Sequence, residues 1–280
     1  DAEKSMIEAE LRQLEGARAE EMKGLLGKDN FLQESYRQEV LKGEEFTRET
    51  TDKDSDITKE LIESAKFAGM NNTRRMHDLF DYTNKIANDT GTKYGFVNNE
   101  QLKQLGHEVE GKTINGLVRV NEDGTSKILI NVDSNKAINT IIGHETTHLL
   151  EGTAEHKKLV DIVKEYATTK GDYDNRLKEF QGLYQGVNAD IENEITADLV
   201  GDYLFTDEEF INNLSTKDPN IFQKVYDYIK HVYKMATAGS TEKRQLEQVK
   251  RRFDKAYKQM SKTVAKETKT NSLTDARSNI

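Results

Sequence analysis

The 280-residue chain contains no cysteine, no tryptophan and a single proline. The missing cysteines exclude disulfides and thiolate ligands for a metal, although they do not identify the compartment. Hydrophobic residues make up only 35% of the chain and charged residues 32%. No apolar run approaches the ~20 residues of a membrane-spanning helix, and no segment resembles a signal peptide. This composition predicts a helix-rich protein with a modest core and no membrane partner.

Basic residues are fewer than acidic residues. The chain has 41 Lys and Arg residues against 50 Asp and Glu, which gives a net charge of −9. An acidic chain of this kind is not expected to have nucleic acid as its main partner. The first residue is Asp1 rather than Met, so we expect a fragment or processed product of a longer protein, with contacts to its other domains.

Against this background one short pattern is informative: H-E-x-x-H, at His144, Glu145 and His148. Residues 135–150 are predicted to form a helix, and residues four apart on a helix lie on the same face. Two imidazoles can therefore reach one metal ion, while the neighbouring carboxylate reaches a water beside it. Zinc requires this combination of neutral imidazoles, a carboxylate base and an open coordination position. We predict one Zn²⁺ at His144 and His148, with Glu145 as the general base.

A catalytic zinc site takes a third protein ligand, and a second predicted helix further along the chain offers carboxylates. Ile191, Ile195 and Leu199 recur every four positions, which indicates a helix. Glu194 and Asp198 are also one turn apart. One of these carboxylates can bind the metal, while the other accepts the spare N–H of a histidine ligand and so fixes its orientation.

The pattern H-E-x-x-H followed by N-E-x-x-A-D at 193–198 resembles the gluzincins, the thermolysin-like zinc metallopeptidases. The resemblance covers about residues 115–200. It implies a zincin-like fold and zinc-dependent hydrolysis of peptide bonds. It also implies that the metal ligands are His144, His148 and Glu194, with Asp198 as the hydrogen-bond partner of a histidine.

Other third ligands can be compared with Glu194. Asp198 itself is an alternative, as in zincins with an aspartate ligand. Glu192 is a weaker choice, because Thr196 rather than a carboxylate lies one turn further on. The metzincin continuation would need a glycine at 151 and a histidine at 154, where this chain has Glu151 and Ala154. These differences favour Glu194.

Two strands are predicted just before the zinc helix, at 117–120 and 127–132, on either side of an Asp-Gly turn. Asp133 or Ser134 is expected to cap the helix that follows. In zincins an edge strand lies above this helix, and an extended peptide pairs with it by strand addition. The sequence therefore predicts a polypeptide substrate bound as an extended strand.

Asn115 and Gly116 resemble the part of thermolysin-like edge strands that grips the substrate backbone, so they are candidate substrate-binding residues. An ordinary hairpin that closes a small sheet explains these two residues nearly as well. Peptide hydrolysis also needs a donor for the tetrahedral oxyanion. Thermolysin-like enzymes supply it from a His or Tyr downstream of the glutamate ligand, and the candidates here are His231 and Tyr203, with His231 slightly favoured.

The expected fold class is α+β and predominantly helical, with a small sheet. Residues 1–54 are expected to be a charged helical extension and 261–280 a disordered tail. Between them, 55–260 is the predicted metallopeptidase domain. It would consist of the sheet and zinc helix at 89–152 and a helical lower half at 153–260, in which helices at 155–169 and 175–183 fill the long interval before Glu194.

The same motifs resemble peptidase modules in the very long multidomain proteins of phages and mobile elements. A cytoplasmic or phage-associated location is therefore favoured. Two alternatives to an endopeptidase stay open: a helical structural or interaction module with an inactive zinc site, and a zinc amidase acting on cell-wall peptides. The intact Glu145 argues against the inactive site, because a structural zinc site has no use for a base.

Overall fold

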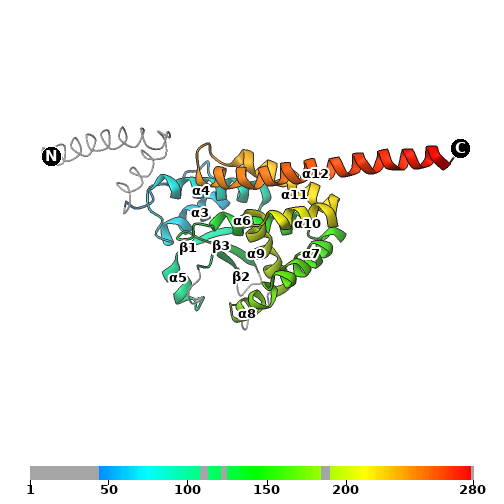
Figure 1. Cartoon of the computed structure of the whole chain (residues 1–280). Coiled ribbons are helices and arrows are strands. Elements are labelled where there is room, and N and C mark those ends of the chain that lie inside the picture. Colours follow the sequence, from blue (N-terminus) through cyan, green and yellow to red (C-terminus); the bar gives the residue numbers. More distant parts are fainter. Residues whose placement is uncertain (1–43, 108–112, 121–124, 184–189, 279–280) are drawn as a thin grey trace, which may run out of the picture.

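Helices surround one small sheet, with helix α6 (Ala137–Leu150) in the middle of the molecule (Figure 1). The computed structural model describes residues 44–107, 113–120, 125–183 and 190–278, with the side chains of 120, 183 and 263–278 excepted. The predominantly helical α+β class expected from the sequence is confirmed. No helix in the described part of the chain is long and apolar enough to cross a membrane.

The sheet has three strands in the order β1-β3-β2. β2 (Gly116–Val120) and β3 (Ser126–Asn131) form the predicted antiparallel pair, with Leu117 opposite Leu129. β1 (Tyr94–Val97), which was not predicted, runs parallel to β3 on its other side, with Tyr94 opposite Ile128. Within the described residues β2 therefore has a strand partner on one side only.

Helices α3 (Asp56–Phe67) and α4 (Arg74–Thr90) precede the sheet. Each begins after a hydroxyl residue whose side chain accepts a backbone N–H, Ser55 and Thr73 respectively. A short helix, α5 (Asn99–Gln104), follows β1 and begins with a capping box at Asn98.

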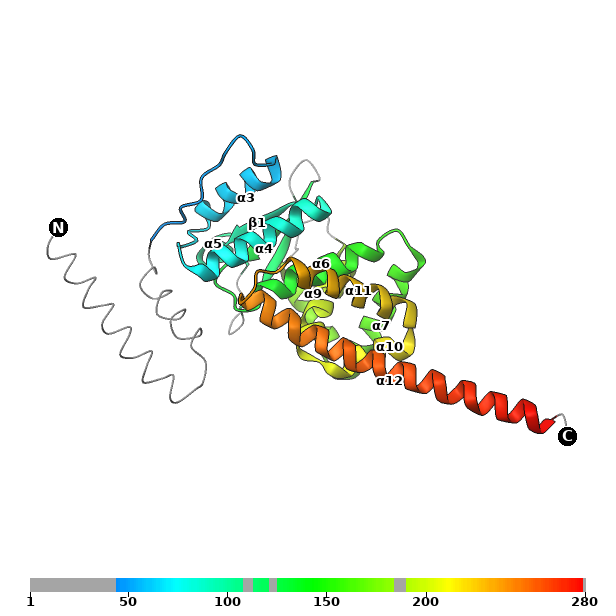
Figure 2. The ribbon, with the colours of Figure 1, turned by 90° about the horizontal axis from the view of Figure 1, so that it is seen from above.

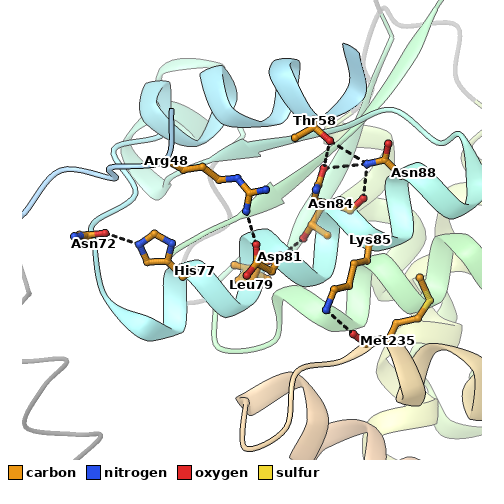
Figure 3. Close-up of polar contacts among 11 residues, drawn as sticks. Arg48, Thr58, Asn72, His77, Leu79, Asp81, Asn84, Lys85, Asn88 and Met235 are labelled. Atoms are coloured by element: carbon orange, nitrogen blue, oxygen red, sulfur yellow. Dashed lines mark hydrogen bonds and ion pairs between the residues drawn. The ribbon is translucent and has the colours of Figure 1, made fainter. Parts of the chain in front are cut away.

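Polar contacts fix α4 against its neighbours (Figure 3). The hydroxyl of Thr58 on α3 donates to Asn84, at 2.8 Å. At the other side, the Lys85 ammonium donates to the carbonyl of Met235 at the end of α11, at 3.1 Å. α4 is thereby tied both to the N-terminal helix and to the C-terminal half of the chain.

The predicted zinc helix is α6, and nearly all of its residues are buried, from Ala137 to Thr147 and again at Leu150. The expected N-cap was wrong by two or three residues. The cap position is Lys136, which makes no side-chain cap hydrogen bond. Ser134 instead accepts the backbone N–H of Lys136, at 3.0 Å, because the chain makes one further turn before the helix begins.

Three helices follow α6, and the last of them carries Glu194 and Asp198. α7 (Ala154–Lys170) and α8 (Tyr173–Leu183) match the two helices predicted between His148 and Glu194. α9 (Ile191–Thr206) follows, capped by Asp190, which accepts the backbone N–H of Asn193. α9 packs directly against α6.

The C-terminal half is completed by α10 (Glu208–Lys217), α11 (Pro219–Met235) and α12 (Thr241–Ser278). Asp218 caps the start of α11, and Pro219 is its first residue. The expected disorder after 261 is corrected, because α12 continues as helix to Ser278 and projects from the body of the molecule (Figures 1 and 2). That segment lacks an apolar period but also lacks glycine and proline, so nothing local interrupts the helix.

Most of the predicted N-terminal extension, 1–43, lies outside the described residues. The part that is described, 44–54, contains no helix, which corrects the expectation there. Phe46 is buried instead and packs on Phe80 and His77, with ring centroids 5.2 and 4.8 Å away. One cluster of buried apolar residues runs from Phe46 to Ala256.

Candidate metal centre

His144 lies on the buried face of α6 and is only 6% exposed. Burial, together with the nearby His148, lowers the pKa of the His144 imidazole to about 3. The ring is therefore neutral at any physiological pH. A neutral, buried imidazole has a free lone pair, which is the form in which histidine binds metals.

Glu194 on α9 faces this ring. Its carboxylate oxygen Oε2 lies 3.8 Å from Nε2 of His144. The two helices can approach this closely because they cross at glycines. A Cβ atom on Gly143 would lie 2.0 Å from the carbonyl oxygen of Ala197, and one on Gly201 would lie 2.3 Å from that of Asn139. Glu194 therefore points into the protein toward the predicted metal site.

The surroundings of Glu194 destabilise the ionised form of its carboxyl in the metal-free fold. Burial raises its pKa to about 8, and the negative charges of Asp190, Asp198 and Glu151 add to the shift. Its buried Oε2 atom has no hydrogen-bond partner. A buried polar atom without a partner is costly and uncommon in folded proteins. A cation at this position would remove both sources of instability.

The donor atoms of His144 and Glu194 fit a zinc ion. Zinc bonds to nitrogen and oxygen are about 2.0–2.2 Å long, so two ligand atoms that share an ion are roughly 3–4 Å apart, and the 3.8 Å separation lies in this range. Among the described residues, no three His, Asp or Glu side chains are close enough to hold an ion as they stand. A third ligand must turn toward the pair.

His148 is the predicted ligand with the freedom to do so. Its side chain is 44% exposed, and its ring centroid lies 6.4 Å from that of His144. Nδ1 of His148 contacts Oε2 of Glu151 at 2.8 Å. A carboxylate on one ring nitrogen orients the ring and leaves the other nitrogen, Nε2, available as a ligand atom. Glu151 thus takes the position that the sequence suggested for Asp198.

Asp198 has a different partner in the structure. Its carboxylate forms an ion pair with the guanidinium of Arg176 on α8, in place of the predicted hydrogen bond with His144 or His148. The same guanidinium binds Asp202 at 3.1 Å, and Asp202 accepts from Asn139 on α6 at 3.1 Å. Asp198 therefore belongs to a network that joins α8, α9 and α6 beside the candidate ligands.

Glu145 is 4% exposed and lies among side chains from α4 and β1. The phenol of Tyr94 donates a hydrogen bond to its Oε1 atom. The hydroxyl of Thr90 lies 3.5 Å from the same oxygen. Among the described residues no hydrogen bond holds the second oxygen, Oε2. Oε1 of Glu145 is thus held by a hydrogen bond, whereas Oε2 is not held by any described residue.

The two predicted oxyanion donors are already engaged. Nε2 of His231 contacts Asp89 at 2.9 Å, and its side chain is 51% exposed. The hydroxyl of Tyr203 donates to Asp172 at 2.8 Å. Tyr228, one turn before His231 on α11, differs from both, because its buried hydroxyl has no partner. Burial raises the pKa of the Tyr228 phenol, and the negative charges of Glu145 and Asp89 raise it further.

Asn115 and Gly116, the candidate substrate-binding residues, lie where β2 meets α6. The side-chain oxygen of Asn115 accepts a hydrogen bond from Ser134 at 2.7 Å, and its carbonyl accepts from Asn131. A Cβ on Gly116 would lie 2.5 Å from the carbonyl of Leu129. Both residues therefore have structural contacts that hold the edge strand in place.

Comparisons with known proteins add no assignment. No protein-family model, curated protein or solved structure matches the chain. The site is therefore interpreted from its own geometry.

Three residues of the site were missed from the sequence: Tyr94, Glu151 and Tyr228. Tyr94 lies on a strand of only four residues, whose parallel partner β3 is distant in the sequence. Glu151 could have been found, because it follows His148 by only three residues, at the end of the predicted helix. Tyr228 is one of 11 tyrosines, and its position is set by the packing of α11, which no local pattern reveals.

Proposed function

We propose that the protein is a zinc-dependent endopeptidase of the gluzincin type, with His144, His148 and Glu194 as metal ligands. The observation that carries the proposal is the pair formed by His144 and Glu194. A buried, neutral imidazole faces a buried carboxyl oxygen that has no partner. Neither group has a favourable role there without a cation, whereas both are suitable zinc ligands.

The arrangement of elements supports a zincin-like fold as part of this proposal. An antiparallel edge strand, the H-E-x-x-H helix and a later helix with the glutamate occur in the expected order. We infer that an extended substrate pairs with the free side of β2, because an edge strand presents unpaired N–H and C=O groups. Asn115 and Gly116 would act by holding this strand in position.

A bound zinc ion supplies Lewis-acid polarisation of the scissile carbonyl and acidifies water. Glu145 removes a proton from the attacking water through Oε2 and delivers it to the leaving amine nitrogen. As the carbonyl oxygen gains negative charge it needs a hydrogen-bond donor. We assign this role to the hydroxyl of Tyr228, because it is buried and lacks a protein partner, and because the negative charge of Glu145 acts on it.

The proposal is tested with Glu145→Gln, which keeps the size of the side chain but removes the base. Zinc should remain bound at one ion per chain, while the rate of peptide cleavage falls on the order of 10²–10⁴-fold. Chelation should abolish cleavage by the wild type. Glu192→Gln is the matched control, because Glu192 lies on α9 near Glu194 but is paired with Lys164 at 2.8 Å; it should retain both zinc and activity.

Three outcomes would contradict the proposal. Equal cleavage of a broad peptide library by wild type and Glu145→Gln would exclude Glu145 as the base. Zinc binding without any cleavage would favour the interaction module. Cleavage confined to cell-wall peptides, with polypeptides untouched, would favour the amidase.

A further inference from the structure

A hydrogen bond joins Tyr94 on β1 to Glu145 on α6. Tyr94 lies at the start of β1 and is 2% exposed, and its hydroxyl contacts Oε1 of the predicted base. Neither the H-E-x-x-H pattern nor the carboxylate helix contains this residue. We propose that Tyr94 is a positioning residue that fixes Glu145 by holding Oε1, so that Oε2 is presented to the attacking water. This inference rests on the proposed peptidase function.

The first step of the argument concerns which groups can hold Glu145. Thr90 is the other hydroxyl near Oε1, but it is 3.5 Å away and also contacts the carbonyl of Ile86, at 3.0 Å. A hydroxyl has one proton to donate, and Thr90 has a shorter alternative acceptor. The phenol of Tyr94 therefore provides the main hydrogen bond to the carboxylate.

The second step concerns the rigidity of the donor. Tyr94 is held by the parallel pairing of β1 with β3, opposite Ile128. The adjacent Gly95 has no room for a side chain without displacement, because a Cβ there would lie 3.1 Å from Leu129, Lys127 and Ser64. Burial and the charge of Glu145 both raise the pKa of the Tyr94 phenol, so it keeps its proton and stays a donor.

The third step concerns the consequence for Glu145. A glutamate side chain has three rotatable bonds, and a base is effective only within hydrogen-bond reach of the proton it removes. With Oε1 fixed from the sheet side, rotation about the last bond is restricted and Oε2 has a defined position. Loss of the phenol should let the carboxylate turn, so that it is in the productive orientation for a smaller fraction of the time. The expected effect is therefore on the chemical step and not on substrate binding.

The experiment compares Tyr94→Phe with the wild type in the full chain. We expect kcat for peptide cleavage to fall about 10- to 100-fold, with KM and zinc stoichiometry unchanged. In a Glu145→Ala background, Tyr94→Phe should have no further effect on the residual rate. Tyr166→Phe is the matched control, because it removes a tyrosine-to-carboxylate hydrogen bond of 2.8 Å, to Asp207, away from the site; its kcat should equal that of the wild type.

A second readout does not depend on activity. In metal-free protein, Tyr94→Phe should lower the urea concentration at the midpoint of unfolding. The decrease should be smaller in the Glu145→Ala background than in the wild type, because Glu145, which accepts the hydrogen bond of Tyr94, is already absent. Tyr166→Phe and Glu145→Ala should instead be additive. Unchanged kcat in Tyr94→Phe, a loss confined to KM, or additivity with Glu145→Ala would each overturn the proposal. If wild type shows no Glu145-dependent cleavage, the proposed function fails and the catalytic role of Tyr94 with it, whereas the unfolding cycle still reports the hydrogen bond.

Discussion

The crossing of α6 and α9 at Gly143 should couple stability to metal binding. In Gly143→Ala the new Cβ would lie 2.0 Å from the carbonyl oxygen of Ala197 and 3.0 Å from the backbone nitrogen of Gly201. Non-bonded contacts are normally about 3.5 Å or longer, so the helices would have to separate by roughly 1.5 Å. The obstructing atoms are backbone, which cannot rotate aside as a side chain can.

Two opposing terms set the magnitude. Overpacking a core typically costs about 1–3 kcal/mol and occasionally more, and a clash with backbone belongs at the upper end. Alanine is favoured over glycine inside a helix by about 1 kcal/mol. We therefore expect a net loss of about 2 kcal/mol in the free energy of unfolding. Separation of the helices would also move Glu194 away from His144, and zinc affinity should fall at least about 10-fold.

The assays are urea unfolding of metal-free protein and zinc titration against a competing chelator. Gly182→Ala is the control, because Gly182 is also a helical glycine, on α8, and a Cβ there would meet nothing within 4 Å. This control should be as stable as wild type or slightly more so, with unchanged zinc affinity. If Gly143→Ala behaves in the same way as Gly182→Ala, the two helices are not in backbone contact and the geometry of the His144–Glu194 pair is wrong.

Two further predictions concern charge and hydrogen bonding at the site. The pKa of Glu194 is about 8 in the metal-free fold, against an ordinary value of 4.5. The protonated carboxyl therefore contributes its full stabilisation of the fold below about pH 4.5, and this stabilisation is lost as the pH rises through 8. Glu194→Gln should make the metal-free protein more stable than wild type at pH 9 but not at pH 5, and equal differences in urea midpoint at both pH values would contradict the assignment. Tyr228→Phe should lower kcat about 10- to 100-fold through loss of the oxyanion donor without lowering stability, because its buried hydroxyl has no partner to lose; an unchanged kcat would remove Tyr228 from the mechanism.

Much of the helical framework could be predicted from the sequence because its signals are local. The Asp218–Pro219 start of α11 and the four-residue spacing of Ile191, Ile195 and Leu199 on α9 depend only on neighbouring residues. The antiparallel pair β2 and β3 was predicted for the same reason, since a turn joins two short apolar runs. β1 was missed because its partner β3 lies about thirty residues away and the pairing is parallel.

Some residues of the candidate site could likewise be predicted from local spacing, and others could not. His144, Glu145 and Glu194 follow from spacing along single helices, and the structure brings His144 and Glu194 to 3.8 Å. The hydrogen-bond partners do not follow from spacing. Arg176 on α8 reaches Asp198 on α9, and Lys85 on α4 binds the carbonyl of Met235 at the end of α11. Such contacts depend on how helices pack, for which the sequence offers no local signal.

The exposure of α6 changes abruptly at its last turn, and this bears on the proposed function. Residues up to Thr147 are buried, whereas His148 and Leu149 are exposed. In the proposed peptidase, a substrate would therefore approach from the carboxyl end of the helix. The helix dipole places partial negative charge at this end, which favours a cation and disfavours an anion. In the proposed enzyme, the end of the helix that favours zinc would also oppose the developing oxyanion, so a neutral donor from another element would be required there.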